Sequence, residues 1–210
     1  GTPTLYIEPL GDLPNAGNPS GWTAPGYDVS QDDGKGDPDN GDHSGNWQSG
    51  VHGVGYADND DTTLLAYDGS TASVYTRTVF QVEDAAAIQA MTFQADYDDG
   101  YIVWLNGVEI CRSTTMNARA AVWNASSGDH EATGTLGVPI DLGAFVNLLV
   151  DGENVLAAGA WNTGAGSSDL SMIPRLTLYD GPYTPQPLHV YLTWQGDPST
   201  TITVNYQTGA

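Results

Sequence analysis

The stretch YDDGYIVWLNGVEICR, residues 97–112, constrains the fold of this chain more than any other segment. Two strand-like runs flank the dipeptide Asn106-Gly107, which is a strong signal for a two-residue β-turn. Both central residues of a type I′ turn need positive φ, and Asn and Gly tolerate it best. Asp98-Asp99-Gly100 marks a second tight turn just before. The pattern predicts three consecutive antiparallel strands, over residues 91–97, 102–105 and 108–112.

Other segments also have the patterns of strands, and none has that of a long amphipathic helix. The apolar run ENVLAAGAW suits a strand covered on both faces, and Pro174 places part of its strand at a sheet edge or a bulge. Residues 84–91 fit either a single helical turn or a loop. The 26 glycines and 12 prolines favour many short strands joined by turns. The sequence therefore predicts an all-β fold, a two-sheet jelly-roll β-sandwich over residues 1–180, with further strands at 4–7, 75–82, 153–161 and 171–179.

The composition changes at DGPYTPQP, which predicts a linker over residues 181–187. The 188–210 segment after it holds two alternating runs, a two-strand C-terminal extension that is too short to bury a core of its own. It is either the start of a truncated second domain or a pair of strands that complete another sheet.

The charge of the chain is strongly negative. Asp and Glu number 26 against 5 Lys and Arg, which gives a formal net charge of −21. Such a surface repels the phosphates of nucleic acids and of anionic membranes, so we expect neither partner. No apolar run reaches the roughly 18 residues that a membrane-spanning helix needs, so we expect no membrane insertion.

The acidic residues are mostly Asp, which suits compact Ca²⁺-binding loops. Two loops combine close spacing with oxygen-bearing side chains, although neither matches the EF-hand pattern because the closing Glu is missing. We expect at least one Ca²⁺ in them, and we infer secretion from these loops. The alternative is a solvated acidic surface. The candidate ligands are Asp58, Asn59, Asp60, Asp61 and Thr62 in one loop and Asp33, Asp37, Asp39 and Asp42 in the other.

Asp96, Asp98 and Asp99 have a structural interpretation, because Asp-Gly is common in tight turns. The Asp98-Asp99 pair acts together with Asp169 only if the sandwich brings their loops together. Paired carboxylates also occur in glycoside hydrolases, but acidic pairs are too frequent in this chain to indicate catalysis. We expect no enzymatic role.

Glycan binding requires an aromatic ring with polar groups at its edge. Trp123 lies in a stretch without clear periodicity, and Trp161 is followed by Asn162 in a predicted loop. For each tryptophan taken alone, core packing is the alternative interpretation and the more common one. The candidate ligand-binding residues are Trp123, Trp161, Asn162 and Asp169.

Five motifs in order resemble the galactose-binding-like jelly-roll modules of secreted bacterial proteins and glycoside hydrolases, over about residues 20–180. The motifs are GWTAPGYDVS, WQSGVHGVGYADNDDTT, VYTRTVFQV, ADYDDGYIVWLNGVEICR and GENVLAAGAWNTGAGSSDLSMIPRL. The resemblance implies a β-sandwich that is commonly non-catalytic, often holds a structural Ca²⁺ and sometimes binds glycans. The acidic insertion at residues 30–46 is longer than in such modules.

The final segment PLHVYLTWQGDPSTTITVNYQT is similar to the opening of the fibronectin-like domain that precedes the catalytic domain of purple acid phosphatases. None of the metal-ligand motifs of those phosphatases is present, so no catalytic residue is carried over. The resemblance implies that a parent protein carries a metallophosphatase-like domain outside this chain.

Together these features predict a secreted, non-catalytic, Ca²⁺-stabilised module that binds a polysaccharide or glycan, or spaces domains in a larger extracellular protein. The alternative is a structural subunit of an extracellular fibre or surface layer. In that case residues 188–193 and 200–206 add as strands to the sheet of an identical subunit.

Overall fold

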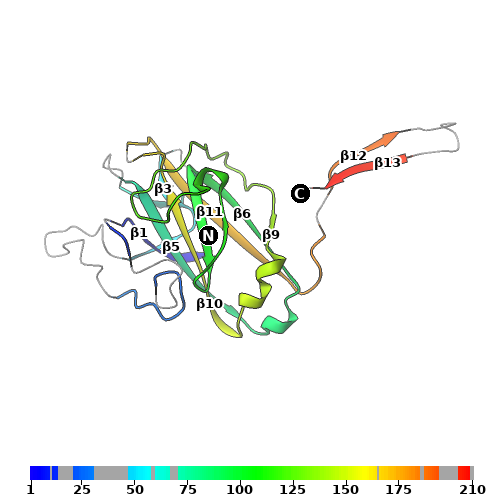
Figure 1. Ribbon diagram of the computed structural model, residues 1–210, viewed down its shortest axis with the longest axis horizontal. Coiled ribbons are helices and arrows are strands. Elements are labelled where there is room, and N and C mark those ends of the chain that lie inside the picture. The colour runs from blue at the N-terminus through cyan, green and yellow to red at the C-terminus, as the bar shows by residue number, and fades with distance from the viewer. Residues whose placement is uncertain are drawn as a thin grey trace.

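The computed structural model describes residues 1–9, 11–13, 21–30, 47–57, 60–66, 71–164 and 166–184, and the backbone of two strands at 187–193 and 203–208. These residues form a jelly-roll β-sandwich of two sheets with a two-strand C-terminal extension (Figure 1), as the sequence predicts.

Sheet A has six antiparallel strands, and sheet B has five strands that are antiparallel apart from the β3–β4 pair. Short 3-10 turns η2 (Ala85–Ala87), η3 (Thr114–Met116) and η4 (Gly143–Leu148) connect them, so residues 84–91 begin with a helical turn. The order in sheet A is β2 (Gln48–Val51), β1 (Pro3–Ile7), β5 (Ser73–Val82), β10 (Gly152–Trp161), β7 (Gly100–Leu105) and β8 (Val108–Arg112). The order in sheet B is β4 (Thr63–Leu64), β3 (Val54–Tyr56), β11 (Leu170–Tyr179), β6 (Ala90–Asp98) and β9 (Ile140–Asp141).

Sheet A is buried on both faces. Its inner face meets sheet B in the main core, to which β7 contributes Val103 and Leu105. Its outer face carries a second core around Trp104 of β7 and Trp161 of β10. Trp22, from the segment before β2, covers this outer face. These two faces explain why the β7 and β10 sequences are almost continuously apolar instead of alternating.

The predicted hairpin is confirmed at its turn. Strands β7 and β8 pair antiparallel, and φ is +50° at Asn106 and +87° at Gly107. The Asn106 amide is part of the frame: its Nδ2 donates to Leu148 O and to Asn154 Oδ1, and its Oδ1 accepts from Val155 N, each at 2.8 Å.

The predicted set of three consecutive strands is wrong at its first connection. Strand β6 pairs with β11 in sheet B, whereas β7 pairs with β10 in sheet A. The chain crosses between the sheets at Asp99, because Met91 and Phe93 of β6 face the main core from one side and Val103 and Leu105 of β7 face it from the other. We call residues 96–100 the corner.

Strand β11 is only partly covered on its β3 side. Strand β3 pairs with residues 170–172, while β6 pairs with residues 171–179. Tyr179 O accepts from Gln89 N at the β6 side, so the strand's alternation directs the backbone groups of Pro174, Leu176 and Leu178 to the opposite edge. Among the described strands nothing pairs with that edge beyond Met172, so Pro174 occupies the edge position that the sequence suggests.

The C-terminal strands β12 (Pro187–Thr193) and β13 (Thr203–Thr208) pair antiparallel with each other. In Figure 1 this hairpin stands apart from the two sheets of the sandwich. The interpretations of the tail, as the start of a fibronectin-like domain or as strands for another subunit, stay predictions.

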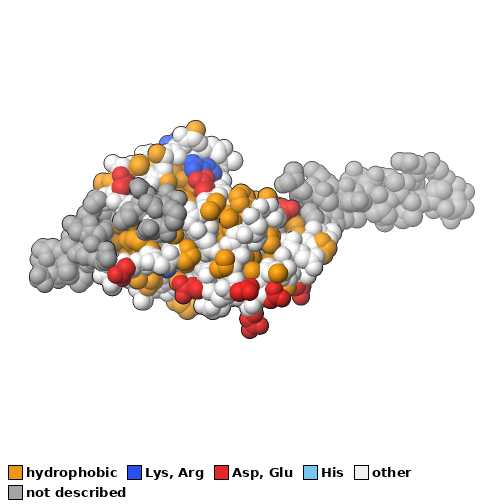
Figure 2. All heavy atoms as spheres, turned by 60° about the horizontal axis from the view of Figure 1, so that its bottom comes forward, with side chains coloured by type: hydrophobic (Ala, Val, Ile, Leu, Met, Phe, Trp, Pro, Cys, Tyr) orange, Lys and Arg blue, Asp and Glu red, His pale blue; other side chains and the backbone are white. Residues whose placement is uncertain are grey.

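The surface view in Figure 2 shows acidic side chains dispersed over one face, several of them along its lower edge, with little basic surface between them. Across the described part of the chain, no helix is both long and apolar enough to span a bilayer.

Replacing Asn106 tests the frame role of the hairpin. Asn106→Ala removes three hydrogen bonds and places a less tolerant residue at positive φ. We expect the free energy of unfolding in urea to fall by about 3 kcal/mol. Asn117→Ala, at an exposed position, is the control and should change it by less than about 0.5 kcal/mol. Equal effects of the two substitutions would contradict the assignment.

Candidate metal centre at the corner between the sheets

The corner brings three aspartates together where the chain leaves sheet B for sheet A. Asp96, Asp98 and Asp99 are all buried, and the peptide bond between Asp98 and Asp99 is cis. Gly100 follows because the neighbouring loop lies close: a Cβ at this position would come within 2.8 Å of Thr115 Oγ1 and of Ser127 Cβ. The Asp-Gly pair therefore has the structural role in the turn that its sequence suggests.

Asp98 is the acidic group at which different loops meet. Its side chain is 2% exposed, and its Oδ1 is a buried atom without a hydrogen-bond partner. Glu131, from the loop between β8 and β9, and Asp169, from the loop between β10 and β11, each place a carboxylate oxygen beside it. The three oxygens all lie within 4.8 Å of one another. Within the described ranges, this is the one group of three or more carboxylate, imidazole or thiol side chains close enough to share an ion.

The electrostatics of this cluster are unfavourable without a cation. Burial, followed by the negative charges of Asp99, Asp169 and Glu131, raises the pKa of Asp98 to about 8. Two oxygens bound to one Ca²⁺ at about 2.4 Å each can be at most about 4.8 Å apart, so the observed spacing is compatible with a shared ion. Oxygen-only donors suit Ca²⁺ rather than Zn²⁺. The donor set and the orphaned Oδ1 of Asp98 therefore fit a hard divalent cation.

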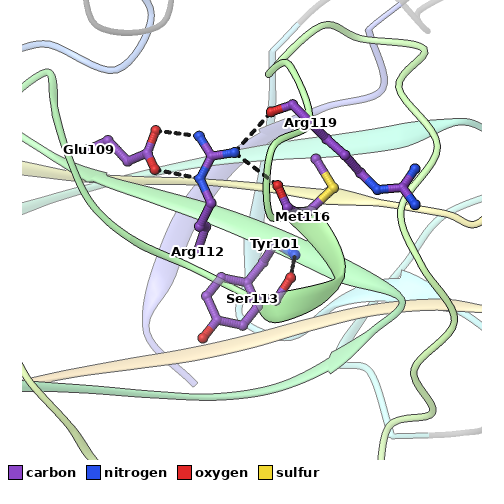
Figure 3. Close-up of polar contacts among 6 residues, drawn as sticks. All are labelled: Tyr101, Glu109, Arg112, Ser113, Met116 and Arg119. Atoms are coloured by element: carbon purple, nitrogen blue, oxygen red, sulfur yellow. Dashed lines mark hydrogen bonds and ion pairs between the residues drawn. The ribbon is translucent and has the colours of Figure 1, made fainter.

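The long loop that carries Glu131 is fixed at its start by Arg112, at the end of β8. The Arg112 guanidinium donates to both carboxylate oxygens of Glu109, at 2.6 and 2.7 Å, in a bidentate ion pair (Figure 3). Its Nη1 also donates to the carbonyls of Met116 and Arg119, at 2.9 Å each. Ser113 Oγ accepts from Tyr101 N at 3.0 Å, which joins the same segment to β7.

Further along, the same loop is fastened to the end of β6. Asp96 Oδ1 accepts from Thr133 N at 2.9 Å. The His130 ring stacks on Tyr97, with 3.9 Å between the ring centroids and 8° between the planes, and its Nδ1 lies 2.9 Å from Tyr97 O. These contacts hold the segment on both sides of Glu131 against the corner.

The structure brings together Asp98 and Asp169, as the sequence requires for these two residues to act jointly. Glu131 was missed by sequence reasoning. It lies 33 positions after Asp98 in a loop without periodic pattern, in the segment DHEA, so no local signal pointed to it.

The candidate ligand-binding residues divide into two groups. Trp161 and Asn162 are fully buried: Trp161 packs in the outer core, and Asn162 Nδ2 donates to Tyr56 Oη and Thr71 O at 2.9 and 2.7 Å. For Trp161 the alternative of core packing applies, and neither residue offers a surface to a ligand. Trp123 is half-buried, with its backbone N bonded to Asp12 Oδ1 at 3.0 Å. A ligand contact at Trp123 stays a prediction.

The predicted Ca²⁺ loops are only partly within the described residues. Asp33, Asp37, Asp39, Asp42, Asp58 and Asn59 lie outside them. Asp61 Oδ1 accepts from Ser171 Oγ at 3.1 Å, and Asp60 has a buried Oδ1 without a hydrogen-bond partner. Thr62 is exposed and donates its backbone N–H to Gly53 O. A Ca²⁺ in these loops stays a prediction.

A separate cavity of about 390 Å³ lies between β5, β10 and β11, beside the uncovered edge of β11. Its wall is mostly apolar, and the part of the chain that the structure describes contributes no carboxylate to it, so the cavity is separate from the acidic cluster. His52 in this wall places Nε2 2.7 Å from Thr78 Oγ1, and burial lowers the pKa of its imidazole to about 4. The lining side chains include His52, Thr78, Phe80, Leu156, Arg175, Leu176 and Leu178.

Comparison with known proteins gives structural similarities alone. No model of a known family matches the chain, and no curated protein matches it. A β-glycosidase from Bacteroides vulgatus aligns at 13% identity and a TM-score of 0.41, over 100% of this chain and 24% of its own. The α-L-rhamnosidase of Streptomyces avermitilis, complexed with L-rhamnose, aligns at 21% identity and a TM-score of 0.37, over 54% of this chain and 10% of its own.

A PA14 sugar-binding domain from an RTX adhesin aligns at 17% identity and a TM-score of 0.30, over 54% of this chain and 51% of its own. The chain thus spans a quarter or less of the two glycosidases and about half of the PA14 domain. At these TM-scores nothing about function follows from the similarities.

The lowered pKa of the half-buried His52 predicts a pH dependence of stability. The His52 imidazole binds its second proton below about pH 4 in the folded protein, and already below about pH 6.5 in the unfolded chain. Stability from this group is therefore present above about pH 6.5 and is lost as the pH falls toward 4. His52→Gln keeps a polar group near Thr78 and cannot titrate. We expect the wild-type protein to lose more unfolding free energy than this variant between pH 7 and 4.5. If the difference in unfolding free energy between the wild type and His52→Gln did not change with pH, the lowered pKa of His52 would be refuted.

Proposed function

We propose that this chain is a non-catalytic module of a secreted protein, stabilised by Ca²⁺ bound at Asp98, Glu131 and Asp169, and that it binds carbohydrate at this ion. The observation that carries the proposal is the convergence of three carboxylate oxygens on one point, with one of the side chains buried. A buried charge without a partner is costly, and a cation offsets this cost.

The three carboxylates differ in exposure, which supports an ion whose coordination shell is open to solvent on one side. Asp98 is inside the protein, Asp169 is half-buried and Glu131 is exposed. Ca²⁺ takes six to eight oxygens, so three carboxylates and nearby carbonyls leave positions that water fills on the exposed side. Hydroxyl oxygens of a sugar are hard neutral donors and can replace such waters. Tyr97 and His130, which precede Asp98 and Glu131 in the chain, stack on each other and are both half-buried, and the exposed part of these rings is the proposed contact for the apolar face of a sugar.

The non-catalytic part of the proposal follows from the same arrangement. Glycoside hydrolysis needs two carboxyl groups that flank a bound sugar, about 5 Å or more apart, with water access to one of them. Asp98 is buried and lies against Glu131 and Asp169 instead. None of the described residues that line the cavity beside β11 carries a carboxylate.

The extracellular setting is consistent with the expected affinity. A site with few protein carboxylates and several waters binds Ca²⁺ in the range of about 10⁻⁴ to 10⁻³ M, as extracellular modules do. Such a site is filled outside cells and not in the cytoplasm. The dispersed negative surface supports the same setting, because it disfavours association with nucleic acids.

Calcium dependence of stability is the direct test of the ion. After dialysis against a chelator, addition of 10 mM CaCl₂ should raise the unfolding temperature of the wild-type protein by about 3–10 °C. Asp98→Asn should abolish this increase. It should not lower the unfolding temperature in the absence of Ca²⁺, because the raised pKa of Asp98 already keeps this carboxyl mostly uncharged at pH 7, and the amide is uncharged too. Asp129→Asn, an exposed position in the same loop, is the charge-matched control and should respond as the wild type does. A full response in Asp98→Asn would refute this site.

Carbohydrate recognition is tested on a glycan array with the wild-type protein, in 5 mM CaCl₂ and then in EGTA. We expect binding in Ca²⁺ that disappears in EGTA and in Asp98→Asn, and that persists in Asp129→Asn. Binding that survives EGTA would remove the ion from recognition. An array without any signal would leave the module as a Ca²⁺-stabilised spacer between domains.

A further inference from the structure

Asp99 lies next to the proposed ligand Asp98 in the chain and has a different environment. It is 3% exposed, and both of its carboxylate oxygens accept backbone hydrogen bonds. Oδ1 accepts from His130 N at 3.1 Å, and Oδ2 accepts from Thr163 N at 2.7 Å. It does not belong to the group of oxygens that lie within 4.8 Å of one another.

These two hydrogen bonds connect Asp99 to both of the loops that supply the other ligands. His130 is the residue before Glu131. Thr163 opens the loop that leads from β10 to Asp169. The backbone carbonyl of Asp99 adds a third connection, since it accepts from Thr115 Oγ1 at 3.0 Å. The Asp99 side chain therefore joins the two loops, in addition to the backbone hydrogen bond that Ser127 N donates to Asn162 O at 2.9 Å.

Asp96 provides a useful contrast. It is also buried at the corner, but its described hydrogen bonds go to Thr133 alone, through the backbone N at 2.9 Å and the hydroxyl at 3.4 Å. It fastens the loop of Glu131, and it has no hydrogen bond to the described residues of the loop of Asp169. Of the corner aspartates, Asp99 is the one whose carboxylate spans both loops.

We infer that Asp99 is a positioning residue for the metal centre: it holds the loops of Glu131 and Asp169 against the corner before the ion binds, and so sets the affinity for Ca²⁺ without ligating it. This inference rests on the proposed function. A carboxylate that accepts two backbone N–H groups is a fixed acceptor, and partners that orient metal ligands typically contribute 10- to 100-fold in affinity.

The substitution Asp99→Asn tests this role with minimal change of shape. The amide keeps one oxygen acceptor and replaces the other with an NH₂ group, which cannot accept from the second backbone N–H. We expect Ca²⁺ affinity, measured by isothermal titration calorimetry, to fall about 10- to 100-fold. Asp129→Asn controls for the loss of one negative charge near the ion and should weaken binding by less than about threefold.

Two further measurements separate positioning from a general loss of structure. First, Eu³⁺ luminescence lifetimes count the waters on a bound ion. Asp99→Asn should retain bound Eu³⁺ with at least one additional water, because one loop no longer holds its carboxylate in place. Second, hydrogen exchange in the wild-type protein needs no variant. The amides of His130 and Thr163 should already be protected in EGTA, because the Asp99 carboxylate is their acceptor.

The outcomes distinguish the two proposals. If the wild-type protein binds no Ca²⁺, the proposed function fails whatever Asp99 does. If the wild-type protein binds Ca²⁺ and Asp99→Asn binds it equally well, the inference on Asp99 is wrong. It is equally wrong if the two amides exchange freely in EGTA and become protected only on addition of Ca²⁺, because the ion would then organise the loops.

Discussion

Burial of sheet A on both faces is the constraint on which the rest of the structure depends. Strands β7 and β10 face sheet B with one set of side chains and the aromatic outer core with the other. Trp22 stacks on Tyr75 in that outer core, with 4.5 Å between the ring centroids. Among the described residues no third sheet covers the outer core, and residues of connecting segments, Trp22 and Met116 among them, lie over it instead.

The corner at residues 96–100 exists because the two sheets share the main core. A chain that fills one core from both sides has to cross between the sheets, and the crossing after β6 places three aspartates at the end of the sandwich. The same short segment has two kinds of carboxylate. Asp99 accepts a backbone N–H at each of its oxygens and Asp96 accepts one at Oδ1 only, while Asp98 lies beside two other carboxylates. Adjacent residues of one type thus have different environments, which are set by the groups that surround them.

The local parts of the fold were predictable from sequence, and the non-local parts were not. Asn106-Gly107 fixes its turn through its own backbone preferences, and the apolar run of β10 indicates a strand with two buried faces. The strand that pairs with β6 could not be predicted in this way. Alternation indicates which residues of a strand face a core, but not to which sheet the strand belongs. The cluster of three carboxylates was not predicted for a similar reason: spacing favoured crowded aspartates within one loop, whereas Asp98, Glu131 and Asp169 come from three segments and meet only in the folded chain.

The proline in β11 has a consequence for the behaviour of the molecule in concentrated solution. A strand with an open side offers a row of amide donors and carbonyl acceptors that a second sheet can extend, which is a route to fibrillar aggregates. Pro174 has no N–H to offer there, so the row is interrupted within the first few residues after Met172. Together with the repulsion between molecules of net charge −21, this interruption protects the open side of sheet B against uncontrolled stacking.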